Sequence, residues 1–436
     1  MGKLNIHIHT VGCRANQADS SVLTAHLNPE TIAVTGAENA EVYVINTCCV
    51  TVEAERDGKK FARRMLRKNP SAGVIFTGCA VSAFSDITEE FSSQVLAVGG
   101  GATSPKALAS WVNEFASGHR LAAPLPSTKS RRYQYFEDEG ESFNIVGNVQ
   151  GRTRALLKIQ NGCTHNCSYC IVPKARGPEQ SMRPEEIFRQ VDALAAAGAR
   201  ELVFTGVQMG AWGIDLADVP SLAEIVDESA LRFSPGRIRL SSIEPWSVDE
   251  SLIAVMAKNE RICAHLHIPL QSGDDDVLAD MKRGYCASEW LEKVKMARER
   301  IPHVAVGTDV ICGFPTESES AFDNTLQVLE QSGVSYVHGF SYSRRPGTLA
   351  AKKWGDNRTV AKERVRRVRA LGEQLQSAYV STQVNTVREV LVETAVRGVT
   401  DTFLTVQLAA ATPGELVKCE LVRCDGDADS LCAKLR

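Results

Sequence analysis

The chain has 436 residues, of which 44% are hydrophobic and 23% are charged, and its formal net charge is -3. This length suggests two or three domains, and the composition is ordinary for a globular protein without a generally basic, nucleic-acid-binding character. No apolar run reaches the about 18 residues of a membrane span, and the first residues lack the apolar segment of a signal peptide, so we expect a cytoplasmic protein with no membrane partner.

Cysteine is unusually frequent, with 13 residues in the chain. Because the cytoplasm keeps thiols reduced, these residues cannot be interpreted as a disulfide framework. Metal or cluster binding is therefore the leading explanation for part of them.

The N-terminal region, residues 1–116, alternates apolar, strand-like runs with helical segments. The runs are Leu4–His9, Val42–Asn46, Val74–Thr77 and Val95–Val98, and the helical segments include Val52–Lys68 and Lys106–Phe115. This alternation predicts an α/β domain with a mainly parallel sheet covered on both faces. Residues 117–150 turn to Gly, Pro, Ser and charged residues and are interpreted as a linker.

Three cysteines of this region, Cys13, Cys48 and Cys79, each come just after a predicted strand. Side chains at the carboxyl ends of neighbouring parallel strands can converge although they are far apart in sequence. Three thiolates meeting there could hold an iron–sulfur cluster with one iron open. Buried cysteines that act as small hydrophobic residues explain the same pattern.

A second set, Cys163, Cys167 and Cys170, lies in one loop with spacings of four and three residues. A four-iron, four-sulfur cubane normally takes four thiolates, so three leave one iron free to bind something else. A structural zinc site is the alternative, but it needs four protein ligands. His165 lies too close to Cys163 to be a natural fourth ligand, so the spacing favours a cluster.

The central region, residues 151–380, repeats a strand–helix unit about six times. Strands are predicted near Ala155, Leu202, Ile238, Leu266, Val304 and Tyr336. Six units favour an incomplete (β/α)6 barrel, because the closed eight-fold form needs about 250 residues. Ligands should gather at the carboxyl ends of the strands, and the cysteine loop follows the first of them.

Polar or small residues follow three other strands of this unit. Thr205 and Gly206 end the second strand, Glu244 follows the third and Gln271 follows the fourth. Such groups could hold the amine, ribose and adenine of a cofactor. Each could equally cap a helix or satisfy a polar group of the core.

Two basic runs fall on predicted helices. The first comprises Lys59, Lys60, Arg63, Arg64, Arg67 and Lys68, and the second comprises Arg364, Arg366, Arg367 and Arg369. Such runs are more often solvated helix faces than binding sites. They are nevertheless the candidate contacts for a phosphate-bearing partner.

A charged helix is predicted over Thr359–Gln383, and residues 381–436 contain short alternating segments rich in Val, Thr and Leu. This alternation predicts a small β-barrel of antiparallel strands. Barrels of this kind often bind RNA, although the fold alone does not establish binding.

The loop with Cys163, Cys167 and Cys170, with Tyr169 before the last cysteine, resembles that of the radical S-adenosylmethionine (SAM) enzymes. The wider chain resembles the radical SAM methylthiotransferase family. The N-terminal segments that carry this resemblance are Gly12-Cys-Arg-Ala-Asn-Gln17, Asn46-Thr-Cys-Cys-Val50 and Thr77-Gly-Cys79. Downstream matches are Gly162–Gly177, His267–Gly273, Gly307–Pro315 and Tyr342–Thr348. A departure lies at Gly313-Phe-Pro-Thr-Glu-Ser318, where the family commonly has Gly-Glu-Thr after Phe-Pro.

The resemblance implies two 4Fe-4S clusters and SAM as cofactors. Cys163, Cys167 and Cys170 would hold the cluster whose open iron chelates SAM and splits it to a 5'-deoxyadenosyl radical, with Tyr169, Thr205, Gly206, Glu244 and Gln271 as SAM contacts. The N-terminal cluster would carry the sulfur to be transferred, and the family pattern Asn-Thr-Cys-x-Val assigns its ligand to Cys48 and not to Cys49. The terminal barrel is similar to the family's tRNA-contacting TRAM domain.

Gly12–Gln17 and Ala175-Arg-Gly-Pro-Glu-Gln-Ser181 most closely resemble the MtaB-type branch. That branch methylthiolates threonylcarbamoyl-adenosine beside the tRNA anticodon, so the resemblance implies the anticodon stem-loop as partner, with an electron donor and a sulfur source that the sequence does not identify. The alternatives are the isopentenyl-adenosine branch and the branch that modifies a ribosomal-protein aspartate. A catalytically silent RNA-binding protein with structural clusters is a rival of another class.

Overall fold

The computed structural model describes residues 2–84, 91, 95–100, 108–109, 112–113, 153–424 and 427–435. The chain forms two compact units, and each is described by itself. The first unit comprises Met1–Asn148, Asn161–Gln180 and Ser343–Ala351, and the second comprises Val149–Gln160, Ser181–Tyr342 and Lys352–Arg436. The predicted linker, residues 117–150, lies outside the described residues, so the predicted domain limits stay predictions. No helix among the described residues is long and apolar enough to cross a bilayer.

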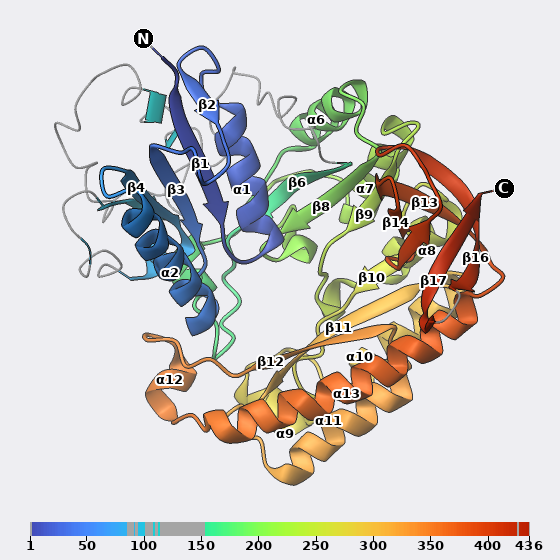
Figure 1. Ribbon diagram of the computed structural model, residues 1–436. Coiled ribbons are helices and arrows are strands. Elements are labelled where there is room, and N and C mark those ends of the chain that lie inside the picture. The colour runs from blue at the N-terminus through green and yellow to red at the C-terminus, as the bar shows by residue number, and fades with distance from the viewer. Residues whose placement is uncertain are drawn as a thin grey trace. The chain divides into compact units, whose positions relative to one another are not determined.

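The first unit is built on a parallel sheet with strand order β2-β1-β3-β4-β5, which confirms the predicted α/β class (Figure 1). Its strands are β1 (Leu4–Thr10), β2 (Ile32–Val34), β3 (Val42–Thr47), β4 (Gly73–Gly78) and β5 (Val95–Gly100). Its helices are α1 (Arg14–Ala25), α2 (Val52–Lys68), α3 (Cys79–Ala83) and α5 (Val172–Arg176). The sequence did not predict β2 or α1. The predicted helix Lys106–Phe115 lies mostly outside the described residues, and residues 108, 109, 112 and 113 of it are helical.

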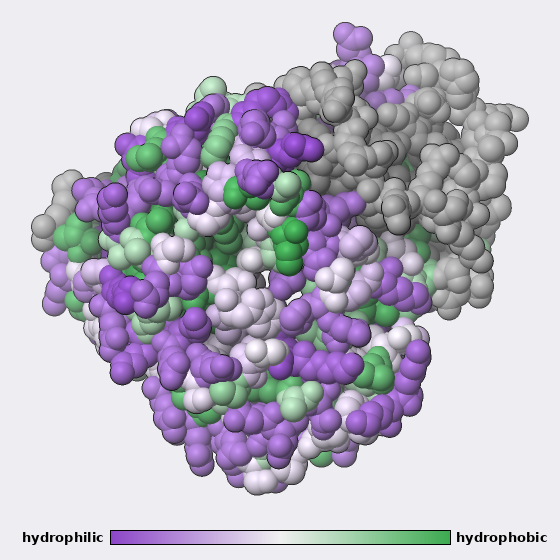
Figure 2. All heavy atoms as spheres, turned by 180° about the vertical axis from the view of Figure 1, so that it is seen from behind, coloured by the Kyte–Doolittle hydropathy of each residue, from purple (hydrophilic) through white to green (hydrophobic). Residues whose placement is uncertain are grey.

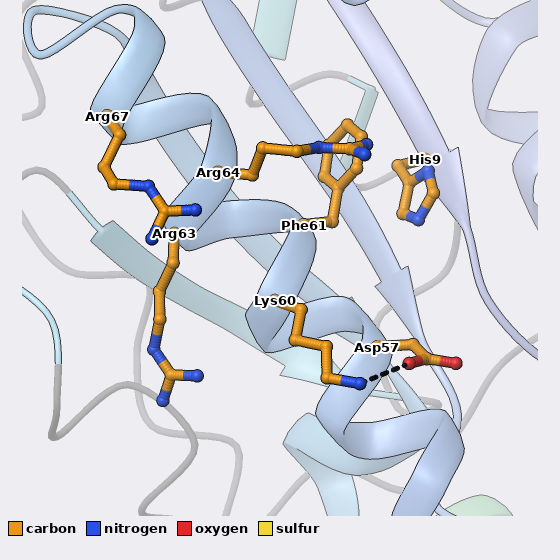
Figure 3. A pocket seen from close by; sticks show the side chains of 7 residues that line it. All are labelled: His9, Asp57, Lys60, Phe61, Arg63, Arg64 and Arg67. Carbon is orange, nitrogen blue, oxygen red and sulfur yellow. Dashed lines mark ion pairs between the residues drawn. The ribbon is translucent and has the colours of Figure 1, made fainter.

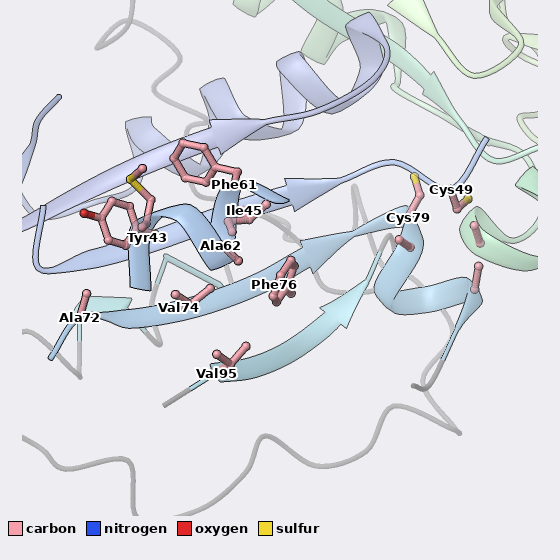
Figure 4. Packing of buried hydrophobic residues seen from close by; sticks show 14 of the residues in the cluster. Tyr43, Ile45, Cys49, Phe61, Ala62, Ala72, Val74, Phe76, Cys79 and Val95 are labelled. Atoms are coloured by element: carbon pink, nitrogen blue, oxygen red, sulfur yellow. The ribbon is translucent and has the colours of Figure 1, made fainter. Parts of the chain in front are cut away.

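The central strand β3 is buried on both faces, as expected for a parallel sheet covered by helices. Val42 and Val44 pack in the cluster that contains Leu23 of α1. Tyr43 and Ile45 pack in the cluster that contains Phe61 of α2 (Figure 4). Alternation along one strand therefore places the two helices on opposite faces of the sheet.

The second unit contains six parallel strands with helices between them. The strands are β6 (Arg154–Asn161), β8 (Glu201–Gly206), β9 (Arg237–Leu240), β10 (His265–His267), β11 (Ala305–Cys312) and β12 (Tyr336–Ser341). They form the sheets β7-β6-β8-β9 and β10-β11-β12, where β7 is Gln180–Ser181, and the parallel bridge between Ser242 and His267 connects the two sheets. The six strands predicted from the sequence are thus confirmed as a partial barrel.

The helices that follow the strands are α6 (Pro184–Ala196), α7 (Leu222–Arg232), α8 (Glu250–Lys258), α9 (Asp275–Asp280), α10 (Ala287–Arg300) and α11 (Glu319–Ser332), with the short helices η2 (Met209–Ala211), η3 (Pro245–Ser247) and α12 (Leu349–Lys353). The long helix α13 (Arg358–Gln383) packs along β12, where Gly339 meets Val368 and Gly372 meets Val337. On the face seen in Figure 2, hydrophilic residues predominate among the described atoms, and apolar residues are scattered.

The C-terminal segment closes into a five-stranded barrel, as predicted. Its strands are β13 (Val387–Thr394), β14 (Arg397–Thr400), β15 (Thr405–Leu408), β16 (Leu416–Cys424) and β17 (Asp427–Leu435). The expectation of antiparallel strands throughout was wrong for one pair, because β15 and β17 pair in parallel. Since β16 lies antiparallel to both β13 and β17, closure of the barrel leaves this one parallel seam. A disulfide joins Cys424 to Cys432, and the other eleven cysteines form no disulfide.

A buried ion cluster attaches this barrel to the partial barrel within the second unit. Glu201 receives hydrogen bonds from Arg237 at 2.8 Å and from Arg239 at 2.9 Å, and all three side chains are almost fully buried. The same guanidinium groups donate to backbone carbonyls of the terminal barrel, at Glu389, Val399, Thr400 and Asp401. Burial would raise the pKa of Glu201, but Arg239 and Arg237 outweigh it and hold this pKa below its ordinary value.

We predict that Glu201→Gln lowers the free energy of unfolding of this unit by about 3–5 kcal/mol, because it removes the buried carboxylate that two buried cations share. Urea unfolding followed by circular dichroism measures the loss. The matched control is Glu228→Gln, which breaks a half-exposed pair with Arg232 and should cost about 0–1 kcal/mol. Equal losses in the two variants would contradict a structural role for the buried cluster.

The gap between wild type and Glu201→Gln should also depend on pH. Because the folded pKa of Glu201 lies below the unfolded value, its contribution is complete above the unfolded carboxyl pKa, about 4.3, and is lost as the pH falls below that value. The gap should shrink by about 1.4 kcal/mol per pH unit in that range. A constant gap down to pH 3 would show that the carboxylate charge is not what stabilises the cluster.

Candidate active site

The cysteine loop that follows β6 lies in the first unit. Cys163, Cys167 and Cys170 are all half-buried, as is Tyr169. Backbone hydrogen bonds fix the loop: Cys163 N–H donates to Gly177 O at 2.9 Å and Cys170 N–H donates to Cys167 O at 3.1 Å. The structure therefore presents three partly accessible thiols on a short, tied loop.

The second set of cysteines converges at the carboxyl ends of three neighbouring strands. Cys13 follows β1, Cys48 follows β3 and Cys79 follows β4, and these strands are adjacent in the sheet. Gly12 and Gly78, directly before two of these cysteines, have φ values of +101° and +87°. A Cβ on Gly12 would lie 2.8 Å from the sulfur of Cys48, so the close approach of the two segments requires glycine.

The thiols of this set are close enough to affect one another. Burial raises the pKa of the Cys48 thiol to about 12, and the charges of Cys79 and Cys13 contribute in the same direction. The pKa of Cys79 is lowered by a hydrogen bond from Cys49 and by Arg176, while Cys49, which donates that bond, has its pKa raised. Figure 4 shows Cys49 beside Cys79 at one end of the apolar cluster. Of the two adjacent cysteines, Cys48 is the one coupled to both Cys13 and Cys79.

Arg176 joins the two cysteine sets inside the first unit. Its side chain is 3% exposed, and its Nε donates to the sulfur of Cys79 at 3.1 Å. The remaining N–H groups donate to Asn161 at 2.7 Å, to Asn16 at 2.6 Å and to Asp19 at 2.9 Å. Arg176 ends α5, six residues after Cys170, so one guanidinium group ties the loop to a thiol of the N-terminal set.

The donor sets are compatible with clusters. Among the described residues, no three His, Cys, Asp or Glu side chains converge as ligands of a single metal ion would. A cubane differs from a single ion because each cysteine binds a different iron atom. Each set offers three thiols and so leaves one position open.

The four candidate SAM contacts lie in the second unit, at the carboxyl ends of β8, β9 and β10. Thr205 is buried, and a Cβ on Gly206 would lie 3.0 Å from the side chain of Gln160. Glu244 forms an ion pair with Arg283. Gln271 has φ +66° and its backbone pairs with Asp309 O at 2.8 Å. Their contact with SAM stays a prediction.

Sequence reasoning missed two features. The partners of Arg176 were not anticipated, although Arg176-Gly177 ended a recognised segment. It also missed an aromatic row on β12: Val337 and Gly339 face α13, so alternation puts Tyr336, His338 and Phe340 on the other face. Of these, His338 and Phe340 are exposed, and their rings stack with planes 11° apart.

The sequence of this chain matches two known protein families and several named relatives. Residues 157–329 match the radical SAM superfamily, and residues 5–99 match uncharacterized protein family UPF0004. Threonylcarbamoyladenosine tRNA methylthiotransferase MtaB of Bacillus subtilis is 31% identical over 96% of this chain and 94% of its own length. The tRNA-2-methylthio-N(6)-dimethylallyladenosine synthase of Syntrophobacter fumaroxidans is 33% identical over 89% of this chain and 84% of its own length.

The chain belongs to the radical SAM methylthiotransferase family. Among solved structures, the radical SAM methyltransferase TsrM of Kitasatospora setae has a TM-score of 0.57 at 16% identity and covers 80% of this chain and 77% of its own. The cobalamin-dependent radical SAM enzyme OxsB has a TM-score of 0.51 at 12% identity over 85% of this chain and 57% of its own. These two likenesses concern the fold alone. For this methylthiotransferase, membership implies a 4Fe-4S cluster and SAM at the radical SAM domain.

We predict that Arg176→Gln lowers the free energy of unfolding of the cluster-free protein by about 3 kcal/mol, because it leaves a largely buried carboxylate and two amides without their donor. Lys60→Gln is the control in the same unit, since its pair with Asp57 is exposed and contributes about 0–1 kcal/mol. Urea titration of both variants measures the difference. A loss no larger than that of the control would show that the buried network is not stabilising.

Proposed function

We propose that this chain is a tRNA methylthiotransferase that inserts a methylthio group at C2 of threonylcarbamoyl-adenosine next to the anticodon. The observation that carries the proposal is the junction of the two cysteine sets, where Arg176 at the end of the radical loop donates to Cys79. An enzyme that only generated a radical would need one set. Two sets of cysteines connected by one guanidinium group are consistent with a reaction that carries out two steps at the same carbon.

The chemistry requires those two tasks. An unactivated aromatic C–H must lose a hydrogen atom, and sulfur must then be delivered to the same carbon. When bound, one cluster with SAM supplies hydrogen abstraction and the other supplies the sulfur, while the protein positions both and excludes side reactions. In this proposal Cys163, Cys167 and Cys170 hold the first cluster.

Cys13, Cys48 and Cys79 hold the second cluster in the proposal, and Cys49 stays a packing residue. Thr205, Gly206, Glu244 and Gln271 contact SAM from the strand ends of the second unit, together with Tyr169 of the loop. The exposed rings of His338 and Phe340 suit a planar substrate, because exposed aromatic faces stack well on nucleobases.

The substrate branch rests on motifs more than on overall identity. Gly12–Gln17 and Ala175–Ser181 resemble the threonylcarbamoyl-adenosine branch. The isopentenyl-adenosine branch is the second candidate, because its Syntrophobacter relative is as similar as the Bacillus MtaB, at 33% against 31% identity. In either case the partner is tRNA, contacted at the anticodon stem-loop and by the terminal barrel.

The substrate test uses three tRNA preparations: complete, lacking threonylcarbamoyl-adenosine and lacking isopentenyl-adenosine. Anaerobic turnover with methyl-labelled SAM and dithionite should label the first and the third and leave the second unlabelled. Mass spectrometry of the nucleosides identifies the product. The reverse pattern would move the enzyme to the isopentenyl branch, and label in ribosomal protein alone would remove it from tRNA modification.

The cluster test compares adjacent cysteines. Reconstituted protein should hold about eight irons per chain, Cys48→Ala should keep about four, and Cys49→Ala should keep about eight. Cys48→Ala should still form 5'-deoxyadenosine but lose methylthiolated product, whereas replacement of Cys163, Cys167 and Cys170 should abolish both. Loss of iron in Cys49→Ala instead of Cys48→Ala would reassign the ligand, and full activity of a Cys13, Cys48 and Cys79 triple variant would make these packing residues.

A further inference from the structure

A cationic cavity of about 530 Å³ lies on α2 in the first unit (Figure 3). Four cations and one carboxylate line it, together with two rings. The lining residues are His9, Asp57, Lys60, Phe61, Arg63, Arg64 and Arg67. The whole chain carries a net charge of -3, so this concentration of positive charge is local.

The helix dipole explains only part of this arrangement. Basic residues in the last turn of a helix compensate its negative end, and Arg67 lies in the last turn of α2. Lys60 and Arg64 lie further back, beyond the reach of that effect. They share a face with Arg67 because residues three, four and seven apart meet on one side of a helix.

One cation of the cavity is held in place by a ring. The guanidinium of Arg64 lies 5.3 Å from the centre of the Phe61 ring, and the ring of His9 stacks on Phe61 with centroids 3.8 Å apart and planes 2° apart. Phe61 is 5% exposed, so it serves as a wall and not as a stacking surface for a base. Figure 3 shows Arg64, Phe61 and His9 next to one another. A guanidinium fixed in this way loses little side-chain freedom when it binds an anion.

The electrostatic state of the cavity is also favourable to anions. Burial lowers the pKa of His9, with His7 and Arg64 contributing against Asp57, so His9 is neutral and the positive charge of the cavity comes from the lysine and the arginines. Among the described residues, no carboxylate lies within ion-pair distance of Arg64 or Arg67, whose side chains are exposed. The positive charges of Arg64 and Arg67 therefore face solvent without an ion-pair partner among the described residues.

The second basic run shows what a purely structural arginine run looks like. On α13, Arg364 pairs with Glu317 at 2.6 Å and Arg367 pairs with Asp323 at 2.9 Å. Arg364 is buried and also donates to Glu319 at 3.0 Å. Those cations are already neutralised within their own unit. The two runs look alike in sequence, but the fold brings carboxylates to Arg364 and Arg367, whereas none of the described carboxylates pairs with Arg64 or Arg67.

We infer that the cavity on α2 is a binding site for a phosphodiester group of the RNA backbone, with Arg64 and Arg67 as its main ligands. A guanidinium group matches two phosphate oxygens with two parallel N–H donors, which favours an anion of this shape over neutral ligands. The inference rests on the proposed function insofar as the RNA is the substrate tRNA. It adds a contact on the first unit, far in sequence from the terminal barrel.

A backbone contact makes a distinctive prediction, because phosphate contacts position the RNA and carry no base information. Arg64→Glu with Arg67→Glu should weaken tRNA binding tenfold or more at 0.1 M salt. The slope of log affinity against log salt should fall by about 1.4–1.8, the value for two lost phosphate contacts. The same loss should occur for tRNA with and without threonylcarbamoyl-adenosine.

The matched control is Lys258→Glu with Lys362→Glu, which makes the same change of net charge at exposed positions of α8 and α13. It should leave affinity within twofold of wild type. Both double variants should form 5'-deoxyadenosine from SAM without RNA, which verifies folding. Equal tRNA binding by the two double variants would overturn the inference, even if the cavity still bound a free nucleotide. Methylthiolation by the wild-type enzyme would then still support the proposed function. If the wild-type protein does not bind tRNA at all, both the inference and the proposed function are wrong.

Discussion

The buried guanidinium of Arg176 is the interaction on which the candidate site depends. A cation removed from water is costly unless each of its N–H groups finds an acceptor. Here the acceptors are the sulfur of Cys79, the amides of Asn16 and Asn161, and the carboxylate of Asp19. They come from α1, from the start of α3 and from Asn161 before the cysteine loop, so the fork of one side chain holds three segments of the first unit together.

A similar device operates in the second unit with a different purpose. Arg237 and Arg239 both pair with one carboxylate, Glu201. Their other N–H groups donate to backbone carbonyls of the terminal barrel. Most of these contacts are made to backbone carbonyls, and two side chains of β13 add to them, Glu389 with Arg237 and Glu393 with Arg154. In the first unit, by contrast, the guanidinium faces a thiol and two specific amides, so its environment depends on particular residues. The arginines of the second unit attach the terminal barrel, and Arg176 of the first unit shapes the surroundings of the cysteines.

Patterns within short segments of the sequence predicted most of the strands, but they did not predict contacts between segments that are far apart in the chain. Alternation predicted β1, β3 and β4, and the cysteines after them converge because parallel strands end at one edge. It did not reveal α1, whose buried face includes Asn16 and Ser20, polar residues that mask the apolar period. Those side chains are buried because they bond the strand ends: Asn46 donates to Ser20 at 2.9 Å, and Asn16 donates to Thr47 O at 2.9 Å.

Contacts over long separations were beyond pattern reasoning for a physical reason. Arg176 lies 160 residues from Asn16, and no periodicity within either segment encodes their meeting. The same limit applies to the basic runs. Arg364 pairs with Glu317 across 47 residues, whereas Arg64 lies over the ring of Phe61, three residues away. Whether an arginine run is structural or available to a ligand therefore depends on whether the fold brings carboxylates to it. On α13 the fold brings carboxylates to Arg364 and Arg367, whereas on α2 the ring of Phe61, on the same helix, orients the charge of Arg64 without neutralising it.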